Sequence, residues 1–282
     1  MKLPFGTDLS GKTAVVTGAG GVLCGLFART LADAGAAVAL LDINEEAVQK
    51  LALEIRRQGK TAEAFKADVM DKEELESVHA RVLAKLGPCD ILINGAGGNQ
   101  AGANTGKDYF EMGDIEADVV TFFDLKYQGM AGVLNLNFMG PLLTSQVFAK
   151  DMVGREGCNI LNITSASAES SLTRIPIYSG AEAALGNFTK WLAVHFAKAG
   201  IRVNAIAPGF FVTKQNERLL YDEDGMPTAR TAKVLAATPM ERFGKPEELN
   251  GALLFLLNNE AAGFITGVVL AVDGGFGAYA GV

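Results

Sequence analysis

Two hydrophobic periods alternate along the chain from Lys12 onward. Short runs of β-branched and apolar residues predict buried strands. These runs are TAVVTG, AAVALLD, CDILING, CNILNIT, IRVNAIAPG and VVLAVDGG. Between them, helical spacing of apolar residues, often ending at a glycine, predicts helices. The predicted helices span residues 24–35, 45–58, 71–86, 137–154, 177–199 and 246–257. Such alternation is typical of βαβ crossovers, so we expect an α/β fold: a doubly wound parallel sheet with helices on both faces.

We expect a single domain over residues 1–282, because no linker, repeat or change of composition divides the chain. Two polar segments interrupt the alternation, at residues 98–131 and 214–244, where Gly, Asn and charged residues weaken the periodicity. Open α/β sheets bind ligands outside the carboxyl ends of their strands. We therefore expect both segments to be excursions that shape a substrate site.

Composition and charge narrow the possible partners. The net charge is −7 and the pI is about 5.0, so we expect repulsion from nucleic acids and anionic membranes. The start MKLPFGTDLSGKTAVV lacks targeting features and no apolar run is long enough to span a bilayer, which predicts a cytoplasmic protein. The three cysteines and two histidines show no metal-ligand spacing, so we expect no metal and reduced, buried thiols.

A glycine-rich turn follows the first predicted strand and leads into the first predicted helix. Glycines in such a turn let a pyrophosphate approach the backbone, and the amino end of the helix stabilises its charge. The residues predicted to form this contact are Gly18, Gly20, Gly21, Val22 and Leu23. This turn makes a Rossmann-like version of the doubly wound sheet the expected fold. At Cys24, next in the turn, we favour a small apolar filler over a reactive thiol at a helix terminus.

Asp42 ends the second predicted strand, 24 residues after Gly18. A carboxylate at this place can accept hydrogen bonds from both hydroxyls of an adenosine ribose, and it repels the 2′-phosphate of NADP. Neither Ile43 nor the glycine turn offers a cation to that phosphate, so the sequence favours NAD as cofactor. The alternative role for Asp42 is to cap the next helix, because aspartate is a common N-cap.

Further motifs resemble the short-chain dehydrogenase/reductase family over nearly the whole chain. Ser165 stands 13 residues before Tyr178, which is the family's serine-to-tyrosine spacing. Asn137, in NLNFMG, matches a helix asparagine that holds a proton-relay water in the family. The resemblance also implies cofactor contacts from Asp68, Val69, Asn94, Ala96, Gly97, Pro208, Gly209 and Thr213.

Some details depart from the common family pattern. The turn at residues 94–97 resembles the family's NNAG with Gly95 in place of the second asparagine, and Val22 and Cys24 occupy the last two glycine positions of the first motif. Within the family, the excursion at 98–131, APGFF and the ending VDGGFGAYAGV most resemble the D-mannonate oxidoreductase (fructuronate reductase) type. That type implies a sugar acid as the small-molecule substrate.

The family implies that Tyr178 exchanges a proton with the substrate oxygen while Ser165 binds that oxygen. Four residues after the tyrosine, where the family carries lysine, this chain has Glu182. At about 5 Å and an effective dielectric of about 20, a unit charge is worth roughly 3 kcal/mol, or about two pKa units. An ionised Glu182 would therefore raise the pKa of Tyr178, whereas a protonated one removes the repulsion without supplying a cation. Either form can hydrogen-bond to ribose hydroxyls.

Other cations could replace the missing lysine only if the fold brings them to the site. Arg174, Lys126 and Lys214 are the possible sources, and Lys190 is two further helical turns away. A solvated surface charge is the default expectation for each, with Arg174 the first candidate to clamp a substrate carboxylate. Asn99, in the first excursion, is the second candidate substrate contact.

Three hypotheses follow for the function. The first is an NAD(H)-dependent oxidoreductase that interconverts a secondary alcohol and a ketone on a sugar acid or polyol of the D-mannonate/D-fructuronate type, impaired by Glu182. The second is an NAD-binding protein of the same fold with little or no redox turnover. The third is a non-redox reaction such as dehydration, with Glu182 as base.

The family resemblance also implies a homo-oligomer, either a dimer or a tetramer. The helices predicted at 137–154 and 177–199, together with the last strand, are the implied interface, and NFTKWLAVHFA is apolar on more than one face. His195 lies in this segment, so we expect it to be an interface or core residue rather than a catalyst.

Overall fold

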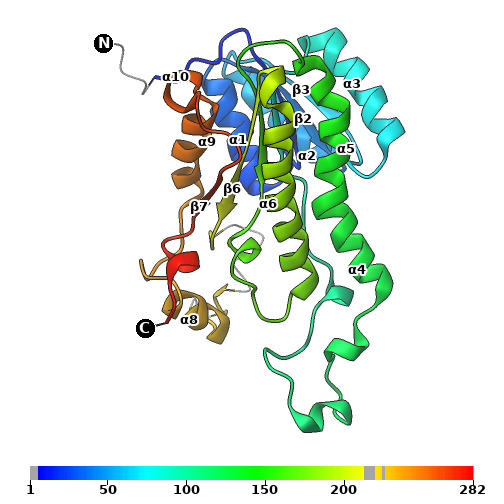
Figure 1. Cartoon of the computed structure of the whole chain (residues 1–282), viewed down its shortest axis with the longest axis vertical. Helices are drawn as coiled ribbons and strands as arrows, with labels where there is room; N and C mark the ends of the chain where they lie inside the picture. The colour runs from blue at the N-terminus through cyan, green and yellow to red at the C-terminus, as the bar shows by residue number, and fades with distance from the viewer. Residues whose placement is uncertain (1–5, 213–219, 224–225, 282) are drawn as a thin grey trace.

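Seven parallel strands form one sheet at the centre of the structure (Figure 1). The computed structural model describes residues 6–212, 220–223 and 226–281. The strand order is β3-β2-β1-β4-β5-β6-β7. The strands are β1 Thr13–Thr17, β2 Ala37–Asp42, β3 Ala62–Lys66, β4 Ile91–Asn94, β5 Cys158–Ile163, β6 Ile201–Pro208 and β7 Val269–Val272. This confirms the predicted α/β fold with a doubly wound parallel sheet.

Helices cover both faces of the sheet because its central strands are apolar on both sides. In β1, Ala14 and Val16 belong to one core, whereas Val15 belongs to the other. The first core is completed by α1, α2 and α9, and the second by α3, α5 and α6. The helices are α1 Val22–Asp33, α2 Glu45–Arg57, α3 Lys72–Leu86, α4 Tyr127–Leu134, α5 Gly140–Phe148, α6 Pro176–Phe196, α8 Ala229–Ala236, α9 Leu249–Leu257 and α10 Asn259–Ala262.

One strand is missing from the predicted set. β3 pairs with β2 from Val38↔Ala62 to Asp42↔Lys66, at the edge of the sheet. Its sequence AEAFK lacks the β-branched run that marks the other strands. Glu63 faces outward and forms an ion pair with Lys85 (3.0 Å). An edge strand that is only half buried carries too weak an apolar signal to be found by periodicity.

The helix predicted at 137–154 begins earlier. α4 starts at Tyr127 and continues through a π-helical segment, Asn135–Met139, into α5. Gly129 conceals this start in the sequence, because glycine weakens a helical pattern. The fold requires it there, since a Cβ on Gly129 would lie 2.7 Å from the carbonyl carbon of Gly102. The excursion at 98–131 therefore ends inside a helix, and the second excursion contains α8.

The chain reverses its winding between β1 and β4, which are neighbours in the sheet although β2 and β3 lie between them in sequence. At such a point the connections leave in opposite directions and open a crevice at the carboxyl ends of the strands. In Figure 1 this is the lower end of the sheet, from which the described parts of both excursions extend. The topology thus fixes where a ligand site can form.

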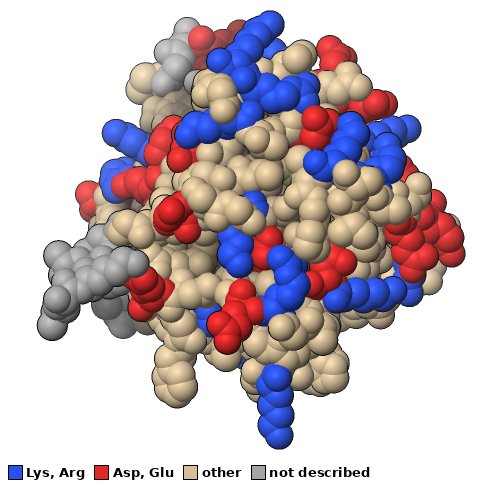
Figure 2. Space-filling model, turned by 90° about the horizontal axis from the view of Figure 1, so that it is seen from above, with Lys and Arg blue, Asp and Glu red and all other residues tan. Residues whose placement is uncertain are grey.

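The outer surface carries charges of both signs. On the face seen from above (Figure 2), Lys and Arg side chains are interspersed with Asp and Glu. Within the described ranges, no helix has both the length and the apolar character needed to cross a membrane. In the same ranges, His, Cys, Asp and Glu side chains form no group of three or more suited to holding a metal ion.

Candidate active site

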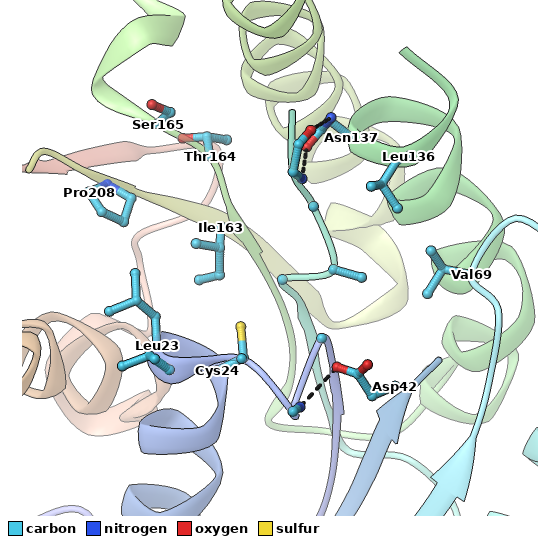
Figure 3. Close-up of a pocket in the computed structure, with 18 of the residues that line it drawn as sticks. Leu23, Cys24, Asp42, Val69, Leu136, Asn137, Ile163, Thr164, Ser165 and Pro208 are labelled. Atoms are coloured by element: carbon cyan, nitrogen blue, oxygen red, sulfur yellow. Dashed lines mark hydrogen bonds between the residues drawn. The ribbon is translucent and has the colours of Figure 1, made fainter. Parts of the chain in front are cut away.

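A cleft with a volume of about 730 Å³ opens at the crevice between β1 and β4. Its walls come from the carboxyl ends of β1, β2, β4, β5 and β6, and from α1 and α6. Asp42 and Ser165 lie toward opposite ends of the close-up in Figure 3, with Cys24 and Ile163 between them. A cleft of this size and elongation can hold a dinucleotide.

The glycine turn brings the backbone close to two other segments. Gly18 has a φ of 68°, and a Cβ there would lie 2.7 Å from the Gly95 carbonyl oxygen and 2.9 Å from the Ala96 nitrogen. Only glycine tolerates both conditions. Gly21 is the N-cap of α1, and no side chain caps this terminus. The first amide groups of the helix therefore remain available to an anion such as a pyrophosphate.

Asp42 closes the turn from the end of β2. Its Oδ2 accepts a hydrogen bond from the Gly20 nitrogen (2.9 Å), and its Oδ1 accepts one from the Asn44 nitrogen (2.8 Å). Each carboxylate oxygen keeps further lone pairs for two ribose hydroxyls. The capping role falls to Asn44, which accepts from the Ala47 nitrogen at 3.1 Å. The alternative of Asp42 as the N-cap of α2 is therefore wrong.

The Cys24 sulfur occupies the space that a side chain at residue 95 would need. A Cβ on Gly95 would lie 2.1 Å from the Cys24 sulfur. Burial, with a smaller contribution from Asp42, raises the pKa of the Cys24 thiol to about 12. The interpretation as an apolar filler agrees with this environment, whereas a reactive thiol would need a lowered pKa. The two departures from the family motifs, a cysteine at residue 24 and a glycine at residue 95, therefore compensate each other in volume.

Asn137 ties the loop after β4 to the π-helical segment (Figure 3). Its amide nitrogen donates to the carbonyl oxygens of Gly98 (2.7 Å) and Val133 (2.7 Å), and its Oδ1 accepts from the Gly98 nitrogen (2.9 Å). A Cβ on Gly97 would lie 2.7 Å from this Oδ1, which explains the glycine there. Both amide hydrogens are used, so a water at this side chain could be held only by the remaining Oδ1 lone pair.

Asn94 does not line the cleft. Its amide nitrogen donates to the Asn162 Oδ1 (2.9 Å) and the Ser145 Oγ (3.1 Å), and its Oδ1 accepts from the Thr144 hydroxyl (2.6 Å). This buried network joins β4 to β5 and α5. The structure differs here from the predicted cofactor contact, because both amide hydrogens are already engaged behind the turn.

Tyr178, Glu182 and Ser165 meet at the far end of the cleft. Tyr178 and Glu182 are one turn apart on α6, and Ser165 follows β5. Both the Ser165 hydroxyl and the Glu182 carboxyl interact with the phenol. The Ser165 oxygen accepts hydrogen bonds from the nitrogen (3.2 Å) and the hydroxyl (3.0 Å) of Ser167. The Ser165 hydroxyl is therefore held between Ser167 and the phenol of Tyr178.

The environment of these groups disfavours their charged forms. Burial, then the Glu182 charge, raises the pKa of Tyr178 well above its ordinary value of 10, and Ser165 offsets part of the rise. Burial raises the pKa of Glu182 from 4.5 to about 8, with a smaller opposing effect from Tyr178. Glu182 is therefore mostly protonated at neutral pH. Its Oε2 has no hydrogen-bond partner in the described structure.

No replacement cation stands beside the phenol: the described residues that line the cleft include neither lysine nor arginine. Lys126 precedes α4 and Lys190 lies further along α6, both away from the cleft. Lys214 lies outside the described residues.

Arg174 is held by the first excursion rather than by the cleft. It has a left-handed backbone (φ 71°), and its guanidinium donates to the carbonyl oxygens of Thr105 (3.3 Å) and Gly106. Asp108 lies 4.0 Å from Arg174 and 2.6 Å from the ammonium of Lys233 in the second excursion. Three segments distant in sequence are thus joined around Asp108.

Most of the predicted cofactor residues line the cleft. They are Gly18, Gly20, Gly21, Val22, Leu23, Asp42, Asp68, Val69, Ala96, Gly97, Pro208 and Gly209. Thr213 lies outside the described residues, and Asn99 is exposed and donates to the Asn104 Oδ1 at 2.9 Å. Phe210 and Phe211 also line the cleft but are absent from the predicted set. Their position directly after Pro208–Gly209, in APGFF, was the available signal.

A cleft of this construction places the chain among the dinucleotide-binding α/β proteins, because the glycine turn and the strand-end carboxylate serve the two parts of an adenosine diphosphate. Residues 25–277 match a family profile described as enoyl-(acyl carrier protein) reductase. The chain is therefore an oxidoreductase that belongs to the short-chain dehydrogenase/reductase family.

Two sequence relatives and one solved structure match this chain over almost its whole length. A Haemophilus influenzae protein described only as an uncharacterized oxidoreductase is 52% identical over 282 residues, covering 100% of this chain and 99% of its own. The Bacillus subtilis uncharacterized oxidoreductase UxuB is 48% identical over 281 residues, covering 99% and 100%. A crystal structure from Haemophilus influenza, provisionally described as a D-mannonate oxidoreductase with bound NAD, is 53% identical with a TM-score of 0.94, covering 98% of each chain.

Proposed function

We propose that this protein is an NAD(H)-dependent oxidoreductase that interconverts a secondary alcohol and a ketone on a sugar acid or related polyol. The observation that carries the proposal is the position of Tyr178 beside Ser165 in the same cleft as Asp42. When bound, NAD would accept or supply the hydride. A sugar acid of the D-mannonate/D-fructuronate type is supported by the similar structure described with that activity.

The residues around Tyr178 handle the proton. In ketone reduction the neutral phenol donates its proton to the substrate oxygen, and the Ser165 hydroxyl hydrogen-bonds to that oxygen and holds it in place. In alcohol oxidation the phenolate must take the proton back, and the raised pKa of Tyr178 makes phenolate scarce at neutral pH. Asn137 positions the loop that borders this end of the cleft.

Asp42 accounts for the choice of NAD over NADP. Its two oxygens face the adenosine end of the cleft, and each retains lone pairs after the contacts with Gly20 and Asn44. A 2′-phosphate would meet this carboxylate without a neighbouring cation, because the described lining holds neither lysine nor arginine.

Glu182 reduces turnover in this proposal. It replaces a cation that would stabilise the phenolate with a buried carboxyl group. Because the equilibrium constant ties the two directions together at a fixed pH, kcat/KM falls by the same factor for reduction and oxidation. Cofactor binding is affected less, since a protonated carboxyl can still bond to ribose hydroxyls.

Substrate recognition is assigned to the segments joined at Asp108. The Arg174 guanidinium is half exposed, and the backbone carbonyls of Thr105 and Gly106 fix its orientation, so it could present its free edge to a carboxylate. Asn99 lies in the same excursion and is the second proposed contact.

The test follows NADH absorbance with purified protein, a keto-acid sugar and the neutral ketose of equal length. We expect oxidation of NADH with the acid, a lower kcat/KM with the ketose, and little response to NADPH. Arg174→Ala should remove the advantage of the acid, while Lys126→Ala, an equal loss of charge outside the ion-pair group around Asp108, should keep it. Equal rates with both sugars, before and after Arg174→Ala, would contradict the substrate assignment.

The alternative function is an NAD-binding protein with little or no redox turnover, and the missing cation beside Tyr178 favours it. This alternative predicts saturable NADH binding by calorimetry without turnover of any keto sugar acid, and no response to Tyr178→Phe. The oxidoreductase proposal predicts that Tyr178→Phe abolishes turnover and retains NADH binding.

We further propose a homo-oligomer located in the cytoplasm. Exposed apolar side chains follow the outer faces of α4, the π-helical segment and α6: Leu134, Met139, Trp191 and Val194. The ring of His195 stacks on Trp191 at 4.8 Å and extends this surface. Light scattering should give a dimer or tetramer that Val194→Glu weakens. The three cysteines are free and buried, which suits a reducing compartment.

A further inference from the structure

The Glu182 carboxyl group is buried without being satisfied. The residue is 3% exposed, lines the cleft beside Tyr178, and its Oε2 has no hydrogen-bond partner in the described structure. The Oγ of Ser179, in the same turn of α6, is also buried and without a partner in that range. Burying a carboxyl oxygen without a partner costs free energy. The group must therefore either take up a proton or, if it is ionised, be balanced by a positive ligand.

The geometry of the cleft indicates which part of a ligand meets this group. Asp42 and the glycine turn take the adenosine and pyrophosphate, so the remaining half of the dinucleotide extends toward Ser165 and Tyr178. That half ends in the nicotinamide ring, which is positively charged in NAD⁺ and neutral in NADH. The two forms of the cofactor therefore differ by one charge at the end of the cleft where Glu182 lies.

We propose that Glu182 makes this protein select the oxidised form of its cofactor, with the ionised carboxylate balancing the positive ring. This inference rests on the proposed NAD site and deepens it. A lysine at the same position would act in the opposite sense, because an ammonium repels a positive ring. The protein should therefore bind NAD⁺ more tightly, relative to NADH, than a variant without the carboxyl group.

Selection of this kind requires a proton to leave. In the free protein burial holds the pKa of Glu182 at about 8, so the group is mostly protonated at pH 6 and mostly ionised at pH 9. A positive ring nearby lowers that pKa, which means that NAD⁺ binding releases a proton to the solvent below about pH 8. Affinity for NAD⁺ consequently rises with pH until the free carboxyl group is ionised, whereas affinity for NADH stays level or falls.

Other titratable groups do not account for such a dependence. Tyr178 alone acts on Glu182, and its raised pKa keeps the phenol neutral over this range. The elements packed against α6 carry Tyr127 on α4, Arg202 on β6 and Lys198 after α6, none of which acts on the carboxyl group.

The adenosine end affects both forms of the cofactor equally. Asp42 and Asp68 line that end, and NAD⁺ and NADH share the same adenosine diphosphate. The Cys24 thiol remains neutral, because its pKa is about 12. The ratio of the two dissociation constants therefore isolates the nicotinamide end of the cleft.

The experiment measures dissociation constants for NAD⁺ and NADH by calorimetry at pH 6 and pH 9, in the wild type and in Glu182→Gln. In the wild type we expect the preference for NAD⁺, measured as the ratio of the NADH and NAD⁺ dissociation constants, to increase by about tenfold or more from pH 6 to pH 9. One unit charge close to the nicotinamide ring is enough for an effect of this size. Glu182→Gln has the same shape without the charge, so its preference should not change with pH. Tyr178→Phe should keep the wild-type dependence.

Proton release gives a measurement that needs no variant. Calorimetry of the wild type at pH 7 in two buffers of different ionisation enthalpy should report release of up to one proton with NAD⁺ and none with NADH. Tight binding of both forms, with a pH-independent ratio and no proton release, would overturn the inference and leave the proposed function standing. Absence of binding for both forms would overturn the proposed function as well, so the two failures are distinct.

Discussion

Replacing Glu182 by lysine should restore the cation beside Tyr178 and raise turnover in both directions. The two residues are one helical turn apart, and the carboxyl group already acts on the phenol. In the wild type at neutral pH the group is mostly protonated, because its pKa is about 8. The substitution therefore adds one positive charge rather than reversing a full negative one.

The expected gain can be worked from this geometry. One unit charge at about 5 Å with an effective dielectric of about 20 lowers the free energy of phenol ionisation by roughly 3 kcal/mol, or about two pKa units. The surroundings that disfavour the carboxylate also disfavour an ammonium, which reduces the effect to about one to two units. The phenolate fraction at pH 7, and with it kcat/KM, should rise by about ten- to a hundredfold.

The assay is the initial rate of NADH oxidation and NAD⁺ reduction from pH 6 to pH 10. For Glu182→Lys, kcat/KM for oxidation should exceed the wild-type value by about ten- to a hundredfold at neutral pH, and kcat/KM for reduction should rise by the same factor at the same pH. Glu182→Gln removes the carboxylate without adding a cation and should gain little at pH 7. Glu169→Lys makes the same substitution at an exposed site outside the cleft and should behave as the wild type. Equal kcat/KM for Glu182→Lys and Glu182→Gln, with cofactor binding intact, would refute the electrostatic reasoning.

Three further predictions concern stability and cofactor choice. Glu182 has a raised pKa in the folded state, so between about pH 4.5 and 8 the folded protein binds more protons than the unfolded chain, and its stability should fall as pH rises through this range. The fall should be roughly 3–5 kcal/mol in the free energy of unfolding. Chemical denaturation at several pH values should show that Glu182→Gln loses this dependence. Asp42→Asn should lower the preference for NAD over NADP by about tenfold or more, measured as a ratio of dissociation constants, because the repulsion of the 2′-phosphate is gone; an unchanged ratio would exclude Asp42 as the determinant. Gly95→Ala should destabilise by about 1–3 kcal/mol in thermal unfolding, because its Cβ would meet the Cys24 sulfur, and adding Cys24→Ala should restore most of the loss; no recovery would contradict the packing of the two residues.

Local patterns predicted much of the fold and of the cofactor site. The apolar runs identified six of the seven strands, because a strand buried on both faces is a continuous apolar run. The missing one, β3, lies at the edge and keeps polar side chains in solvent. The early start of α4 was hidden because Gly129 is selected by its close approach to Gly102, a contact between segments that periodicity does not represent.

Among the candidate substrate and catalytic residues, those set by local spacing were predicted from the sequence, whereas contacts between distant segments were not. The spacing of Ser165 and Tyr178 was readable because β5 and α6 follow one another in the chain and place both residues at one end of the sheet. The hydrogen-bond partners of Arg174 could not be predicted from the sequence, because they are the carbonyl oxygens of residues 105 and 106, which are distant along the chain. Asn94 looked like a cofactor contact by its motif, and the structure commits its amide to a network with β5 and α5.

The sequence by itself determined the alternation of six strands with helices, the glycine turn, the acid at residue 42 and the presence of Glu182 where the family carries lysine, because each is a local pattern or a fixed spacing. Only the tertiary structure decided that Glu182 is buried with one carboxyl oxygen unpartnered among the described residues, that Cys24 occupies the space left by Gly95, and that Asn44 rather than Asp42 caps α2. The reason is physical: burial, and with it a pKa, depends on which distant segments exclude water from a side chain, and the sequence around that side chain does not specify them.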